Sequence, residues 1–119
     1  MSENSVEKTK PLKPSEILSQ TLKLFGENGE YWGQGNYQHK GKYCLIGGVA
    51  KVSGESTCVV HGATTETSPG RAAILVMHQI VGPTVATFND KCSNFTEVKQ
   101  ALCKGIHKAL EIEEANESR

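Results

Sequence analysis

Four residues have side chains that could together perform nucleophilic catalysis: Cys44, His61, His78 and Asp90. A cysteine nucleophile needs a histidine base, and a carboxylate can orient that base. Cys44 follows an aromatic residue at the predicted start of a helix, where the helix dipole and free backbone amides lower a thiol's pKa. The same amides could stabilise an oxyanion. This set is compatible with a cysteine-dependent hydrolase or transferase.

The alternative interpretation of Cys44 is structural. Free cysteine is among the most buried residue types, and here it precedes Gly47 and Gly48, beside which a small side chain can fill space. Neither His61 nor His78 falls within a motif. The structural interpretation is favoured, and no catalytic residue is assigned.

A second set of residues could bind a flat, polar small molecule: Trp32, Gln34, Tyr37, Asn89 and Asp90. Aromatic platforms combined with an amide and a carboxylate are typical of such pockets. However, Asn and Asp side chains after an apolar segment also form turns by bonding to nearby backbone groups. The turn is the favoured role for Asn89 and Asp90, and the binding role remains an alternative.

The chain lacks the usual patterns for metal and phosphate binding. It has neither a C-x-x-C nor an H-x₃-H pair, which are common in zinc sites. Gly33 and Gly35 are not followed by the Lys-Ser/Thr pair of a P-loop. The sequence therefore predicts no metal site and no cofactor.

Three separated segments carry a resemblance to a known family: W-x-Q-G-x-Y at 32–37, Y-C-x-x-G-G at 43–48 and F-N-D at 88–90. In this order they resemble a small bacterial and phage domain family of unknown function, and the resemblance covers about residues 15–112. The resemblance implies an amphipathic first helix, a polar turn after the first motif and a closing helix. It implies no assigned activity, and it suggests a phage or mobile-element accessory protein.

The periodicity of apolar residues predicts a mainly α fold, at the margin of α+β, with about four helices. The first follows an N-cap at Ser15 and ends at Gly26 or Gly29. The others are predicted at 44–52, at 71–81 and after an N-cap at Asn94. A hairpin turning at Lys40-Gly41 and one extended segment at 84–88 complete the prediction, and residues 53–70 form a loop with at most a short strand at 57–60.

Composition places limits on domain organisation, location and partners. The 119 residues predict a polar disordered arm at 1–13, one compact domain at 14–112 and an acidic flexible tail at 113–119. No segment has the length of a membrane span or the form of a signal peptide, so the chain is expected to be cytoplasmic, with thiols rather than disulfides. Thirteen basic and thirteen acidic residues cancel, which does not favour nucleic acid or a membrane as partner.

Together these patterns favour a non-catalytic binding module whose partner is an unknown protein or a small polar molecule. A cysteine-dependent enzyme using Cys44 and a purely structural or interaction domain are the two alternatives.

Overall fold

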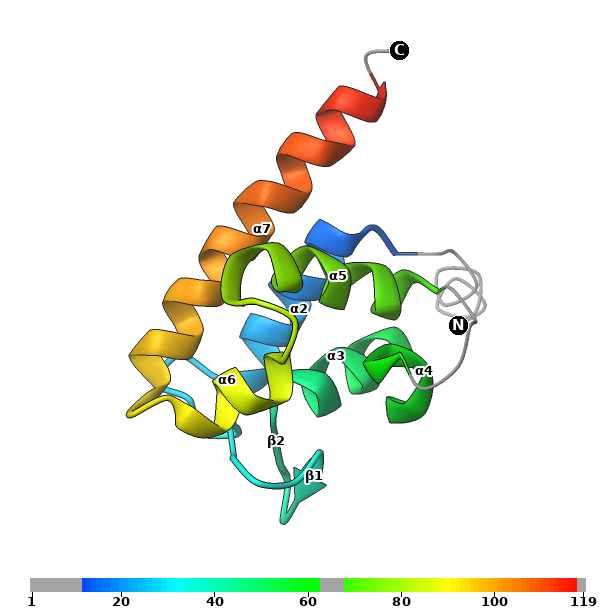
Figure 1. Ribbon diagram of the computed structural model, residues 1–119. Helices are drawn as coiled ribbons and strands as arrows, with labels where there is room; N and C mark the ends of the chain where they lie inside the picture. The colour runs from blue at the N-terminus through cyan, green and yellow to red at the C-terminus, as the bar shows by residue number, and fades with distance from the viewer. Residues whose placement is uncertain (1–11, 63–67, 118–119) are drawn as a thin grey trace, which may run out of the picture.

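The computed structural model describes residues 12–62 and 68–117. Within these residues the chain forms six helices and one two-stranded hairpin (Figure 1). In chain order the elements are α2 (Pro14–Phe25), β1 (Gln38–His39), β2 (Lys42–Tyr43), α3 (Leu45–Ser53), α4 (Thr57–His61), α5 (Pro69–Val81), α6 (Val85–Lys91) and α7 (Phe95–Glu117).

The mainly α prediction is confirmed, but the helix count of four is wrong, because the described residues contain six. The segment predicted to contain at most a short strand at 57–60 is α4. The Ser56 hydroxyl accepts a hydrogen bond from Val59 N, and Gly62 ends the helix with a left-handed φ of 93°. The segment predicted to be extended at 84–88 lies largely in α6. In both segments β-branched residues favoured extended structure, and capping interactions outweigh that preference.

Helix α2 begins two residues earlier than predicted. Its N-cap is Lys13, whose backbone N–H donates to the Glu16 carboxylate at 2.8 Å. Ser15, the predicted N-cap, lies inside the first turn and is buried. The predicted end at Gly26 is confirmed, because Gly26 has φ 88° and is the C-cap.

The core forms where α2, α3, α5 and α7 pack together. Its eight largest fully buried side chains come from these four helices: Ile17, Leu18, Phe25, Leu45, Ile46, Ile74, Met77 and Leu102. Each such side chain contributes roughly 1.5–3 kcal/mol relative to exposure. Among the described residues no single helix is long and apolar enough to cross a membrane; α5 and α6 reach that length and apolarity only as a pair bent by 59°.

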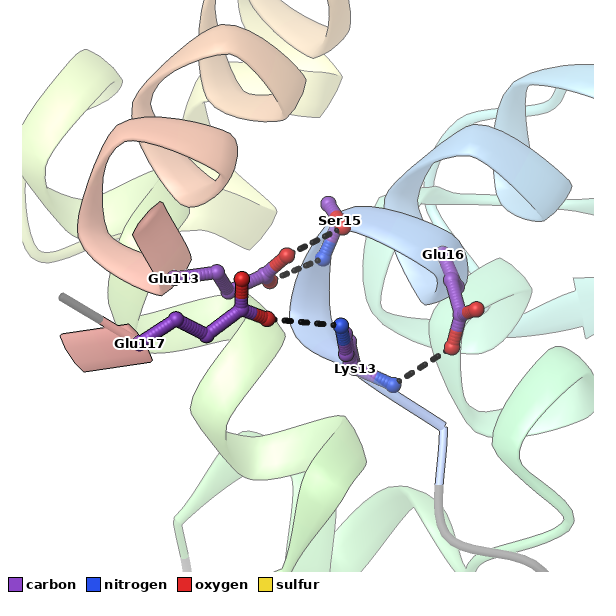
Figure 2. A network of polar contacts seen from close by, with 5 residues as sticks. All are labelled: Lys13, Ser15, Glu16, Glu113 and Glu117. Atoms are coloured by element: carbon purple, nitrogen blue, oxygen red, sulfur yellow. Dashed lines mark hydrogen bonds and ion pairs between the residues drawn. The ribbon is translucent and has the colours of Figure 1, made fainter. Parts of the chain in front are cut away.

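Helix α7 runs along one edge of the molecule, and its last turns project beyond the other helices (Figure 1). The acidic tail was predicted to start at residue 113, but α7 continues through Glu117. The Glu113 carboxylate accepts from Ser15 N at 3.0 Å and from the Ser15 hydroxyl at 2.7 Å. Lys13 Nζ lies 3.1 Å from the Glu117 carboxylate, so the end of α7 is bonded to the start of α2 (Figure 2).

The hairpin turns where the sequence predicted. Lys40 and Gly41 both have positive φ, 54° and 80°, and occupy the two positions between the paired residues His39 and Lys42. Two successive positive φ values are typical of the tight turn that matches the twist of a hairpin. Two backbone bonds join β2 to the preceding segment: Gly33 N to Tyr43 O at 2.9 Å, and Tyr43 N to Tyr31 O at 2.8 Å.

Candidate functional site

Asn89 lies at the centre of the predicted ligand-binding residues, and it is fully buried. Its side-chain oxygen accepts hydrogen bonds from Trp32 Nε1 at 2.8 Å and from Leu45 N at 3.0 Å. Its amide nitrogen donates to Gly33 O at 3.0 Å and to the Asp90 carboxylate at 3.1 Å. An asparagine side chain has two donor hydrogens and two acceptor lone pairs. All four are used within the chain.

Gln34 and Asp90 extend this set of bonds around the end of α6. The Gln34 amide nitrogen lies within hydrogen-bond distance of three carbonyls: Asn89 O at 2.9 Å, Asp90 O at 3.2 Å and Cys92 O at 3.0 Å. The last carbonyls of a helix have no partner within the helix, and a side chain can satisfy them. The Asp90 carboxylate accepts from Gly35 N at 2.9 Å. The segment 32–35 therefore caps α6.

We call the group formed by Trp32, Gly33, Gln34, Gly35, Leu45, Asn89 and Asp90 the latch. It joins the segment before the hairpin, the start of α3 and the end of α6. No buried side-chain polar atom in the described part of the chain lacks a hydrogen-bond partner. The latch therefore offers no unpaired buried group to a small polar ligand.

Cys44 is the N-cap of α3, as predicted, but its surroundings oppose thiolate formation. Its side chain is 4% exposed, and its sulfur accepts from Gly47 N at 3.4 Å. Burial raises the pKa of the Cys44 thiol, and the negative charge of Asp90 adds to this, against hydrogen bonds from Gly47 and Ile46 that lower it. The sequence led us to expect a lowered pKa at a helix start; desolvation outweighs that effect here.

The two candidate histidines bond elsewhere. His61 Nδ1 lies 2.7 Å from the Tyr37 hydroxyl, and the two rings meet edge to face with centroids 5.9 Å apart. His78 is half-buried in the last turn of α5, where burial first, and then the positive charges of Arg71 and His61, lower its pKa. Among the described residues no hydrogen bond joins either histidine to Cys44.

Tyr37 is separated from the residues with which it was grouped. Its hydroxyl bonds to His61 rather than to the latch, and its carbonyl oxygen accepts from Cys44 N at 3.3 Å. Arg71 completes the surroundings of His61, because its guanidinium donates to Val60 O at 3.4 Å and His61 O at 3.2 Å. Nothing in the sequence spacing indicated the Tyr37–His61 contact or the Arg71 cap on α4.

Within residues 12–62 and 68–117, no group of three or more His, Cys, Asp or Glu side chains is arranged to hold a metal ion. All four cysteines lie in this part of the chain, and all are free thiols. No family model, no curated protein and no solved structure matches the chain.

Proposed function

We propose that this protein is a non-catalytic binding module that recognises an acidic segment of another protein. The observation that carries the proposal is the closure of the latch: the buried Asn89 side chain, and the Trp32 indole and Gln34 amide around it, are all bonded to groups within the chain. A buried Cys44 with a raised pKa also argues against the cysteine-dependent enzyme. Recognition is therefore assigned to the exposed surface.

The surface we assign lies on the hairpin and the adjoining end of α4. Tyr37 is 41% exposed while its hydroxyl is held by His61, so the pair is fixed in place and accessible. His39 and Lys42 are direct cross-strand partners, and both are exposed. Side chains of directly opposed residues share one face of a hairpin.

Charge determines the kind of partner. Residues 31–54 contain Lys40, Lys42 and Lys51 but no aspartate or glutamate. Exposed aromatic rings among positive charges suit acidic segments that also carry apolar side chains. A protein partner is favoured over nucleic acid because the charge of the whole chain is balanced, which gives no long-range attraction to a phosphate backbone.

The test is an NMR titration of the isotope-labelled full chain with a synthetic Asp/Glu-rich peptide containing aromatic residues. We expect chemical-shift changes centred on Tyr37, His61 and Lys42 that weaken as salt is added, because exposed charges are screened over about 8 Å at physiological ionic strength. Lys42→Glu should abolish the binding. Lys23→Glu, the same change at an exposed position on α2, should leave it intact.

Three results would contradict the proposal. The first is peptide shifts centred on the latch, which would indicate a small-ligand site. The second is equal loss of binding in the Lys42 and Lys23 variants, which would indicate non-specific charge attraction. The third is tighter binding of a single-stranded oligonucleotide than of the peptide, which would indicate a nucleic-acid partner.

We further propose that the chain is a divergent member of the bacterial and phage family that it resembles, acting in a reducing, cytoplasmic compartment as an accessory protein. Two features support this: the motifs at 32–37, 43–48 and 88–90 contribute to one latch, and all four cysteines are free. A structure of a family member with the same Trp–Asn bond would test the relationship.

A further inference from the structure

The outer face of α7 carries four exposed side chains spaced four residues apart: Lys99, Cys103, His107 and Glu111. Side chains at i and i+4 lie one above the other on a helix. Helix α7 is continuous over these positions and lies at the edge of the molecule (Figure 1). The four side chains therefore form an exposed row that begins with a positive charge and ends with a negative one.

Cys103 and His107 at the centre of this row have the chemistry of zinc ligands. Zinc prefers thiolate sulfur and imidazole nitrogen, and two ligands one turn apart on a helix can bind the same ion. Neither side chain makes a hydrogen bond or ion pair with another described residue. The C-x₃-H spacing is neither the C-x-x-C nor the H-x₃-H pattern considered in the sequence. It places both side chains on the same face only because α7 is a regular helix, and both side chains are exposed there.

One chain supplies only half of such a site. Structural zinc ions take four protein ligands in a tetrahedron, whereas the described residues of one chain provide no group of three. Two further ligands, one sulfur and one nitrogen, are needed to complete it. A second copy of this chain, related by a twofold axis, supplies both of these ligands through its own Cys103 and His107.

The charges at the ends of the row suit this arrangement. If two α7 helices pack antiparallel about an axis between Cys103 and His107, Lys99 of each copy faces Glu111 of the other. Such an interface is self-complementary, as a twofold dimer requires. Leu110, which is 46% exposed and one turn beyond His107, adds apolar surface to the same face.

We propose that Cys103 and His107 form half of a zinc site, and that two copies of the chain bind one Zn²⁺ between antiparallel α7 helices. On binding, each Cys103 thiol releases its proton to solvent and coordinates as a thiolate, while each His107 coordinates as a neutral imidazole. Two thiolates balance the charge of Zn²⁺, and the dimer is then favoured by the metal through mass action.

A second cysteine–histidine pair, Cys58 and His61, provides the matched comparison. Both side chains are exposed, but His61 is already bonded to Tyr37, and α4 has only five residues. Helix α4 contains no aspartate, glutamate, lysine or arginine, so the helix itself has no row of opposite charges around this pair. It should therefore bind no metal that links two chains.

The first experiment adds Co²⁺, and separately Zn²⁺, to the full reduced chain after treatment with chelator. Mass is measured by light scattering. We expect a monomer without metal, a dimer with one ion per two chains, and a cobalt spectrum showing sulfur-to-metal charge transfer and tetrahedral coordination. Cys103→Ser and His107→Ala should each abolish the dimer and the spectrum. Cys58→Ser should preserve both.

The second experiment tests the antiparallel arrangement through charge reversal. Lys99→Glu alone and Glu111→Lys alone each place like charges opposite one another and should weaken metal-linked dimerisation several-fold. The double variant restores opposite charges and should recover dimerisation close to that of the wild type.

The proposal is overturned if metal binds one per chain without dimerisation, or if the cobalt spectrum lacks thiolate ligation. It is also overturned if Cys58→Ser removes the dimer, or if the double charge reversal is no better than the single ones. All of these variants lie at exposed positions, and circular dichroism will confirm that each one is folded.

Discussion

Among single residues, Asn89 contributes most to positioning the rest. It is a polar side chain without exposure, and its bonds reach the indole of Trp32, the first amide of α3 and the backbone before the hairpin. A buried polar group left without a partner costs about 1–3 kcal/mol. Removing the Asn89 side chain would leave several such groups without a hydrogen-bond partner at the same time.

We therefore expect Asn89→Ala to lower the free energy of unfolding by about 2–4 kcal/mol, because it removes bonds to one buried backbone group, to one partly buried backbone group and to the indole. Urea denaturation followed by the fluorescence of Trp32, the single tryptophan, measures this directly. Asn36→Ala, at an exposed position of the same segment, should change stability by less than about 0.5 kcal/mol. Equal effects of the two substitutions would show that the latch adds nothing to stability.

Cys92 should make stability fall at alkaline pH. Burial, aided by the negative charge and hydrogen bond of Glu97, raises the pKa of its thiol from 9.0 to about 11. The unfolded chain loses this proton near pH 9 while the folded chain retains it. The stabilisation is thus complete below pH 9 and is lost progressively between pH 9 and about 11. Denaturation midpoints across this range should decline more steeply for the wild type than for Cys92→Ala.

A similar slope in both proteins would show that the Cys92 thiol does not cause the alkaline loss of stability.

Between elements, the backbone of the hairpin segment at Tyr37 lies very close to α3 at Gly47. A Cβ atom built at Gly47 would overlap the carbonyl oxygen of Tyr37, whereas one at Gly48 would meet side-chain atoms of Phe25 and Thr21 at 3.0 Å. A side chain can move by changing its rotamer, whereas the Tyr37 carbonyl can move only if the backbone shifts. The two neighbouring glycines thus differ in what they permit.

Gly47→Ala should destabilise the fold by about 1–3 kcal/mol, because it pushes the Tyr37 backbone away from α3. Gly48→Ala should stay within about 1 kcal/mol of the wild type, since improved helix propensity offsets tighter packing. Thermal unfolding of both variants gives the comparison. A larger loss of stability for Gly48→Ala than for Gly47→Ala would contradict this. It would mean that packing against Phe25 and Thr21 tolerates an added methyl group less well than the contact with the Tyr37 backbone does.

The same elements show what a single sequence can predict. Local signals located the C-terminal ends of α2 and α5 and the turn at Lys40-Gly41. Local signals also existed for α4, because Ser56 and Gly62 cap it, but its valines suggested a strand. Helix α6 had no such signal. Its carbonyls are capped by Gln34, 55 to 58 residues away, and only the folded chain brings them together.

The candidate site was predictable in its members rather than in its bonding. Trp32, Gln34, Asn89 and Asp90 were selected together, and the structure brings them into contact. Residue types could not indicate that Trp32 would bond to Asn89, or that the Gln34 amide would bond to backbone carbonyls at the end of α6. Nor could they indicate that Tyr37 would turn toward His61, because that depends on where α4 ends.

Across the whole molecule, the two ends of the described chain are joined. Glu113 bonds to the first turn of α2 through both the amide and the hydroxyl of Ser15, and Glu117 pairs with Lys13 (Figure 2). These partners lie 98 and 104 residues apart in the sequence. The last two turns of α7 are therefore fixed to the body although they project beyond the other helices.

Because Lys13 and Glu117 touch, the molecule should tolerate circular permutation. A short Gly/Ser linker could connect residue 117 to residue 13, and new termini could be opened at the exposed turn between Lys40 and Gly41. The core contacts would remain, with α7 now preceding α2 in the chain. We expect such a permutant to unfold cooperatively, with a melting temperature within a few degrees of that of the natural chain. The order of the helices along the chain would then not be required for stability.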